Sequence, residues 1–318
     1  MNKLAIISGF LGGTHNRYMV YQENRTLAEK VAMAAQVEGA DGLELCYPAD
    51  FEDVGELKEL LSRYSLGVSA INFRSRRSGK WWRGSFVSEK GNERQEVVDD
   101  LKRAMDFSVE LGCSRVTTCP LNEGTDNLFE ADPVRLWDHA AETFTAACEH
   151  NRDVRVCIEY KINDPMARCL FGSAGETASF AAQIGANNLG ATMDIGHAFL
   201  AGERPSQAAV LLHKTNRLFY VHVNDNDGVW DWDMLPGAYH FWETIEFFYT
   251  LRKLGYDNDW YGFDVFPKEI DTVENFSAAM HLTRKLESIT DRIDTEEMAR
   301  LMTERNPAKT IPYLYSLI

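Results

Sequence analysis

Short apolar runs alternate with longer amphipathic stretches along almost the whole chain. The apolar runs are nearly continuous, which is typical of parallel strands that are buried on both faces. Eight such strands are predicted, at residues 4–7, 42–46, 67–73, 115–119, 154–160, 191–194, 218–223 and 260–265.

A stretch with apolar residues at helical spacing follows each predicted strand. These predicted helices cover residues 25–38, 55–64, 94–111, 133–150, 174–184, 206–213, 238–254 and 273–289. Gly112, Gly185 and Gly255 follow three of them, where a glycine commonly ends a helix. Eight β-then-α units in series predict a closed parallel barrel or a doubly wound sheet. Because no GxGxxG motif follows the first strand, we expect an α/β fold with a single (β/α)8 TIM barrel over residues 1–290.

Two segments fall outside this repeat. Residues 74–91 are long, basic and aromatic, and they follow the third strand. They are either a solvated loop or a loop that covers substrate or contacts a subunit, and adjacent Trp81 and Trp82 are unusual in a purely solvated loop. Residues 291–318 predict a C-terminal helix, begun by a capping box at Asp294 and Glu297, and an apolar tail that packs on the barrel or on a neighbouring subunit.

Composition narrows the classes of function. The 318 residues carry 33 Lys and Arg against 48 Asp and Glu, a formal charge of -15, which argues against nucleic acid as the main partner. Six cysteines without a CxxC pair are typical of reduced core thiols, and the N-terminal apolar stretch is too short for a signal peptide. With no run long enough for a membrane span, we expect a cytoplasmic protein that does not bind membranes.

Metal-ligand side chains end four successive predicted strands. Glu159 ends the fifth strand, Asp194 the sixth, His222 the seventh and Asp264 the eighth. Chemistry on this fold sits at the carboxyl ends of the strands, so the four side chains should meet at the barrel mouth. Each residue alone is more often a cap or a core residue, but three carboxylates and an imidazole together need a compensating cation. We therefore predict a divalent metal site there.

A second cluster lies close by. His197 follows Asp194 by three residues, and the segment NDNDGVWDWD places Asp231 and Asp233 in alternation with Trp230 and Trp232. The segment is either a solvated acidic loop or part of a second metal site. Oxygen-rich ligation with one imidazole suits Mg²⁺, Mn²⁺ or Co²⁺, so we expect one or two such ions per chain, with Mn²⁺ first.

This combined pattern resembles the xylose-isomerase-like barrel superfamily of sugar isomerases and epimerases, over about residues 3–290. The closest branch is the two-metal aldose–ketose isomerases, such as xylose isomerase and the L-rhamnose isomerases. The motifs that carry the resemblance are Glu159-Tyr160-Lys161, Asp194 with His197, His222 followed by Asp231-Trp232-Asp233, and Asp264.

The resemblance implies a role for each of these residues. Metal one would be held by Glu159, Asp194, His222 and Asp264, and metal two by His197, Asp231 and Asp233. The implied reaction is a metal-assisted 1,2-hydride shift between an aldose and a ketose, with Lys161, Glu159 and Asp264 as catalytic residues. The expected substrate-binding residues are Lys161, His197, Trp230, Phe266 and Asn72. A homodimer or homotetramer is the expected assembly.

Three other functions stay open. Single-metal ketose 3-epimerases resemble the chain at Glu159, Asp194 and His222, but they use a pair of Glu residues as acid and base, and Asp264 is one methylene shorter. Sugar lyases and dehydratases also fit the first metal site. A non-catalytic, metal-stabilised binding subunit is the alternative of another class, and it would gain nothing from Lys161 beside the cation.

Overall fold

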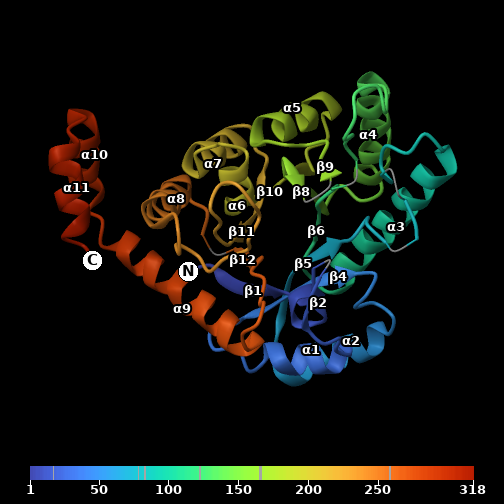
Figure 1. Cartoon of the computed structure of the whole chain (residues 1–318), viewed down its shortest axis with the longest axis horizontal. Helices are drawn as coiled ribbons and strands as arrows, with labels where there is room; N and C mark the ends of the chain where they lie inside the picture. The colour runs from blue at the N-terminus through green and yellow to red at the C-terminus, as the bar shows by residue number, and fades with distance from the viewer. Residues whose placement is uncertain (17, 78, 82–83, 122, 165–166, 258) are drawn as a thin grey trace.

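Eight parallel strands close into a barrel at the centre of the molecule (Figure 1). The computed structural model describes residues 1–318 except 17, 78, 82–83, 122, 165–166 and 258. Around the barrel the strands follow the order β1 (Lys3–Ile7), β12 (Trp260–Phe263), β11 (Leu218–Val223), β10 (Leu189–Asp194), β7 (Arg155–Glu159), β6 (Arg115–Thr118), β5 (Gly67–Phe73) and β4 (Gly42–Tyr47). The predicted (β/α)8 TIM barrel is confirmed.

Helices form the outer layer of the barrel (Figure 1). They are α1 (Leu27–Ala34), α2 (Val54–Tyr64), α3 (Gly91–Glu110), α4 (Pro133–Cys148), α5 (Ala174–Ile184), α7 (Pro205–Lys214), α8 (Phe241–Leu254) and α9 (Thr272–Asp291). Gly185 and Gly255 are the left-handed C-caps of α5 and α8, as predicted from the sequence. Gly112, just beyond α3, has a φ of +74°.

Several short elements in the loops were not predicted. They are the 3-10 turn η1 (Ser8–Leu11), the antiparallel pair β2 (Thr14–His15) and β3 (Val20–Gln22), the antiparallel pair β8 (Asn163–Asp164) and β9 (Ala167–Arg168), and helix α6 (Ile195–Leu200). The prediction ended strand six at Asp194 and gave the following residues no structure. The structure shows instead that the Asp194 carboxylate caps α6 by accepting the backbone N–H of His197 at 2.9 Å.

Polar pairs fill the barrel interior toward the amino ends of the strands. Arg115, which begins β6, donates to both carboxylate oxygens of Asp259 at 2.8 and 2.9 Å. The Arg115 guanidinium also lies 4.7 Å from the ring centroid of Tyr220, whose hydroxyl is 2.8 Å from Ser69 Oγ. These contacts pair some of the buried polar groups below the mouth, while Nε and Nη1 of Arg115 have no hydrogen-bond partner in the described structure. All six cysteines are free thiols, as expected.

Part of the long segment after β5 packs into the core. Ser85 and Val87 donate their backbone N–H groups to the buried carboxylate of Glu123 at distances of 2.8 to 3.0 Å. Trp81 is 4% exposed and lies under the guanidinium of Arg77, whereas Trp82 lies outside the described residues. This segment is therefore anchored to the barrel, and the alternative of a wholly solvated loop does not hold.

The C-terminal extension consists of two helices, where a helix and a tail were expected. Figure 1 shows α10 (Thr295–Glu304) and α11 (Pro307–Tyr315) standing apart from the barrel at the end of α9. Asp294 caps α10 by accepting the N–H of Glu297 at 2.8 Å. The ring of Tyr315 lies 5.0 Å from Trp242 of α8, so the extension contacts the outer layer. Among the described residues, no helix has the length and apolar character needed to cross a bilayer.

Candidate active site

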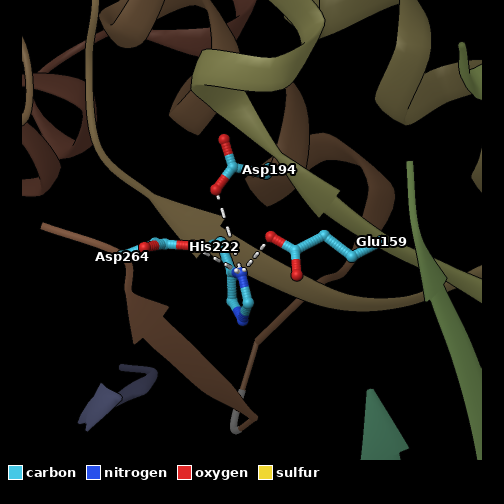
Figure 2. A group of neighbouring side chains, drawn as sticks. All are labelled: Glu159, Asp194, His222 and Asp264. Carbon is cyan, nitrogen blue, oxygen red and sulfur yellow. Dashed lines mark hydrogen bonds and ion pairs between the residues drawn. The ribbon is translucent and has the colours of Figure 1, made fainter. Parts of the chain in front are cut away.

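Four side chains from neighbouring strands converge at the carboxyl end of the barrel (Figure 2). Glu159 ends β7, Asp194 ends β10, His222 lies near the end of β11, and Asp264 directly follows β12. Each offers one ligand atom, and these atoms lie within 4.8 Å of one another. The parallel register explains the convergence, because it pairs Asp194 with His222 across β10 and β11. The structure thus brings together all four residues predicted for the first metal.

The imidazole of His222 faces the three carboxylates with one nitrogen, as Figure 2 shows. Its Nδ1 lies 3.0 Å from Glu159 Oε1, 3.8 Å from Asp194 Oδ2 and 3.9 Å from Asp264 Oδ2. Asp264 therefore reaches the group although its side chain is one methylene shorter than a glutamate. Three carboxylate oxygens and one imidazole nitrogen are a donor set that fits a divalent ion such as Mn²⁺, Co²⁺ or Mg²⁺.

Glu44 holds the other nitrogen of the same imidazole. His222 Nε2 lies 2.9 Å from Glu44 Oε2, and Glu44 Oε1 accepts a hydrogen bond of 2.6 Å from Asn72. A proton on Nε2 directed at Glu44 leaves Nδ1 to point at the candidate metal position, since a ligating imidazole takes its orientation from the partner of its second nitrogen. Sequence reasoning missed Glu44, although a lone carboxylate inside the apolar run GLELCY was a usable signal.

Asp194 is fixed by backbone and amide donors. Its Oδ1 accepts a hydrogen bond of 2.9 Å from the backbone N–H of His197, and its Oδ2 accepts one of 3.0 Å from Nδ2 of Asn224. Asn224 also accepts the N–H of Gly196 at 2.9 Å. A Cβ on Gly196 would lie 2.6 Å from Asn224 Oδ1, so this contact needs a glycine. The first turn of α6 and the end of β11 therefore hold the carboxylate in one orientation.

Crowding of the carboxylates moves their pKa values apart. Burial raises the pKa of Asp264, and the charges of Glu159 and Asp194 add to the rise, to about 7. Burial also raises the pKa of Glu159, but the charge of His222 outweighs it and lowers the value to about 2. Burial lowers the pKa of His222, while Glu44 and Glu159 raise it well above its usual range. His197 and Arg74 also help to lower the pKa of Glu159, yet the pKa of Asp264 stays raised beside its neighbouring carboxylates, which is the electrostatic situation that a divalent cation relieves.

The residues predicted for a second metal are arranged differently. His197 Nε2 lies 3.4 Å from Asp231 Oδ2. The same oxygen forms an ion pair with Lys161, whose Nζ is 2.6 Å away. Asp233 lines the same cavity, and its buried Oδ1 has no hydrogen-bond partner in the described structure. Within the described residues, the four-residue group around His222 is the one set of at least three such ligands close enough for a metal.

A cavity of about 820 Å³ opens above the four ligands. Its wall includes Glu159, Lys161, His197, Asp231, Asp233 and Asp264. Phe266, predicted to bind substrate, also lines it and contacts Phe10 and Tyr21 edge-on at centroid distances of 5.9 and 5.8 Å. Two predicted substrate contacts lie elsewhere: Asn72 is bonded to Glu44, and Trp230 is 48% exposed and does not line the cavity. Trp232 does line the cavity.

Comparisons with known proteins show the family and the fold of the chain. The chain belongs to the xylose isomerase-like TIM barrel family, whose sequence model matches residues 31–286. No curated protein has a sequence that matches the chain significantly.

Solved structures similar to the chain include three sugar enzymes. An L-ribulose 3-epimerase has 19% identity and a TM-score of 0.69, covering 92% of this chain and 96% of that one. A D-tagatose 3-epimerase-like protein has 19% identity and a TM-score of 0.68, over 91% and 98% of the two chains. A D-psicose 3-epimerase with D-tagatose, from Clostridium cellulolyticum H10, has 14% identity and a TM-score of 0.67, over 90% and 99%. At these identities the likeness shows a shared fold.

Proposed function

We propose that this protein is a sugar epimerase that uses a single divalent metal and inverts a carbon next to a carbonyl group. The observation that carries the proposal is the group formed by Glu159, Asp194, His222 and Asp264, whose ligand atoms lie within 4.8 Å of one another and which is the one such group among the described residues. The similarity in fold to an L-ribulose 3-epimerase and a D-psicose 3-epimerase supports a ketose as the substrate.

Glu159 and Asp264 are the proposed acid and base. Both carboxylates line the cavity, and they come from β7 and from the residue after β12. The bound ion would polarise the carbonyl and hydroxyl oxygens of the sugar, which makes the neighbouring C–H more acidic. One carboxylate takes the proton from that carbon, and the other returns a proton to the opposite face. The carboxylate of Asp264 lies 3.9 Å from His222 Nδ1, so this side chain joins the group although it is one methylene shorter than the glutamate of the known ketose 3-epimerases.

Lys161 favours one metal over two. Its ammonium group lies 2.6 Å from Asp231 Oδ2 and 3.5 Å from Asp164 Oδ2. A second cation at His197 and Asp231 would share that oxygen with a positive charge, which is electrostatically unfavourable. In the proposed enzyme Lys161 instead directs its ammonium toward a sugar oxygen in the cavity. This role also separates the proposal from a binding subunit with a purely structural metal.

A two-metal aldose–ketose isomerase is the second candidate. Two observations favour it: His197 Nε2 is 3.4 Å from Asp231 Oδ2, and the buried Asp233 Oδ1 is unpartnered in the described structure. The isomerase would move a hydride directly between two carbons, whereas the epimerase exchanges a proton with a carboxylate that contacts water.

Deuterium labelling tests the proposal. The Mn²⁺-loaded protein is incubated in D₂O with a panel of ketopentoses, ketohexoses and the matching aldoses, and the products are read by NMR. The epimerase predicts a ketose with inverted configuration and deuterium at the inverted carbon. Interconversion of an aldose and a ketose without deuterium would overturn it in favour of the hydride-shift isomerase.

We also propose a homodimer or homotetramer in which the C-terminal helices take part. Met302 and Ile311 are each 45% exposed and Tyr315 is 60% exposed on α10 and α11, which is a large apolar exposure for two short helices. Light scattering of the full chain is expected to give a multiple of the 36.1 kDa chain mass, and a monomer at micromolar concentration would contradict it.

A further inference from the structure

The segment after β5 places three arginines at one cavity, and one of them forms no ion pair with a carboxylate of the described residues. Arg74, Arg76 and Arg77 all line the cavity above the four ligands. Arg77 is paired with Asp100 at 2.6 Å, and Arg76 with Asp164 at 3.4 Å. No ion pair joins Arg74 to a carboxylate in the described part of the chain, and its side chain has one weak contact, 3.8 Å from Nη2 to Cys46 Sγ.

The backbone and neighbours of Arg74 fix its position. Its N–H donates to the carbonyl of Tyr47 at 3.0 Å, directly after the β4–β5 ladder ends. A Cβ on Gly9 would lie 3.5 Å from Arg74 Nη2, so η1 packs close to the guanidinium. Arg74 is half-buried. Burial lowers its pKa, but nearby Cys46, Asp264 and Glu159 raise it further, so the group stays a cation.

Other cationic and polar groups also line the cavity. Lys268 is one of them, and its ammonium group lies 4.8 Å from the ring centroid of Trp232, with no ion pair to a described carboxylate. His15 of β2 and Asn16 are two more. On a chain of charge -15, an arginine without an ion pair to a described carboxylate, in the same cavity lining as a lysine, is not the general character of the surface.

Most carboxylates that line the cavity already have partners or a proposed role. Asp164 and Asp231 each form an ion pair with Lys161, and Glu159 and Asp264 belong to the proposed metal group, which leaves Asp233. The cavity of about 820 Å³ lies toward the upper end of the range of about 300–1,000 Å³ for small-molecule sites, so it has room for a sugar with a charged substituent. A planar guanidinium can donate two parallel hydrogen bonds to two oxygens of a carboxylate or a phosphate. A single hydroxyl group would use only some of the N–H donors of the guanidinium.

We infer that the substrate is an anionic monosaccharide, with a carboxylate or phosphate group held by Arg74 and supported by Lys268. The inference rests on the proposed function, because it assigns the substrate class to the same cavity. It makes Arg74 the residue that selects charged sugars over neutral ones.

Matched substrates and variants test this selectivity. The Mn²⁺-loaded protein is assayed with fructose, fructose 6-phosphate and fructuronate, and with the corresponding tagatose series. We expect kcat/KM for one anionic member to exceed that of its neutral parent by at least 10-fold, and Arg74→Ala to lower the anionic value by about 100-fold. Arg63→Ala, at an exposed position of α2, is the control and should leave every kcat/KM value unchanged.

The anionic sugar with the higher kcat/KM shows whether the site prefers a carboxylate or a phosphate. Equal losses for neutral and anionic sugars in Arg74→Ala would overturn the inference.

A binding measurement keeps the inference testable if no sugar in the panel reacts. Inorganic phosphate and malonate are titrated into metal-free protein by calorimetry, which removes anion binding to the metal. Millimolar binding of one anion that is lost in Arg74→Ala and kept in Arg63→Ala supports the inference even if the proposed reaction is wrong. No binding of either anion, or equal binding in the two variants, would overturn it whatever the enzyme's activity.

Discussion

The imidazole of His222 bridges two carboxylates, with Nε2 2.9 Å from Glu44 Oε2 and Nδ1 3.0 Å from Glu159 Oε1. Glu44 belongs to β4 and Glu159 to β7, so the contact crosses the interior of the barrel. Glu44 does not line the cavity, but through this hydrogen bond it orients His222, a candidate metal ligand.

Replacing Glu44 should therefore weaken metal binding. Glu44→Gln keeps the size of the side chain but removes its charge, so the tautomer and angle of His222 are less strongly fixed. We expect Mn²⁺ affinity to fall by about 10- to 100-fold, measured by competition with a fluorescent chelator. Glu52→Gln, at an exposed position before α2, is the control. An unchanged dissociation constant in Glu44→Gln would show that Glu44 does not position His222.

Gly262 leaves the space that this bridge occupies. A Cβ at Gly262 would lie 2.7 Å from His222 Cδ2 and 2.8 Å from Glu44 Oε2. Gly262→Ala should lower the free energy of unfolding of the metal-free protein by about 1–3 kcal/mol, because neither neighbour has room to retreat. Chemical denaturation measures the change. Gly91→Ala, at a helix start where the added Cβ meets nothing within 4 Å, should have little effect, and equal effects at the two positions would contradict the packing argument.

The position of these elements was largely predictable from the sequence, whereas their side-chain partners were not. Continuous apolar runs marked all eight barrel strands, and the carboxyl-end rule then placed Glu159, Asp194, His222 and Asp264 together. Glu44 was missed because an apolar run hides one inward-facing carboxylate. Its partner His222 is 178 positions away, and only barrel closure joins them.

Trp230 and Asn72 show a second limit of the sequence. Alternation in VWDWD predicts that the two carboxylates point the same way while the indoles pack, but Trp232 lines the cavity together with Asp231 and Asp233. The backbone N–H of Trp232 donates to the carbonyl of Trp230 at 3.0 Å in a tight turn. Asn72 ends a strand at the mouth, yet its amide turns to Glu44. Such choices depend on contacts between distant segments.

Lys161 is predicted to contribute to turnover rather than to metal binding. Lys161→Ala removes an ammonium group from the cavity wall, so kcat/KM for the true substrate should fall by about 100-fold or more. Lys58→Ala, on the outer helix α2, should retain activity. If Lys161→Ala retains full turnover, Lys161 has no part in the mechanism.

Glu123 is predicted to anchor the segment that carries Arg74. Its carboxylate accepts the N–H groups of Ser85 and Val87 and the hydroxyl of Ser85. Glu123→Ala leaves buried donors unpaired, so the unfolding free energy should fall by about 2 kcal/mol and limited proteolysis near residues 85–88 should accelerate. Glu149→Ala, exposed after α4, serves as the comparison. Unchanged proteolysis of Glu123→Ala would mean that other contacts hold this segment.

Removal of the metal should destabilise the folded protein. An ion that binds only the native state adds about 2.7 kcal/mol when its free concentration is 100 times its dissociation constant. We expect the melting temperature to fall after treatment with EDTA and to recover with Mn²⁺ in a concentration-dependent way. The variant Asp194→Asn should lose most of this response, and a full response in that variant would place the ion elsewhere.

The number of metal ions per chain tests the central claim most directly. Metal-free protein is loaded with Mn²⁺, freed of unbound ion, and measured by elemental analysis beside His222→Ala, with circular dichroism to confirm that the variant folds. One ion per chain in the natural protein, and nearly none in folded His222→Ala, is the predicted result. Two ions per chain, or one ion retained by folded His222→Ala, would contradict a single site at Glu159, Asp194, His222 and Asp264.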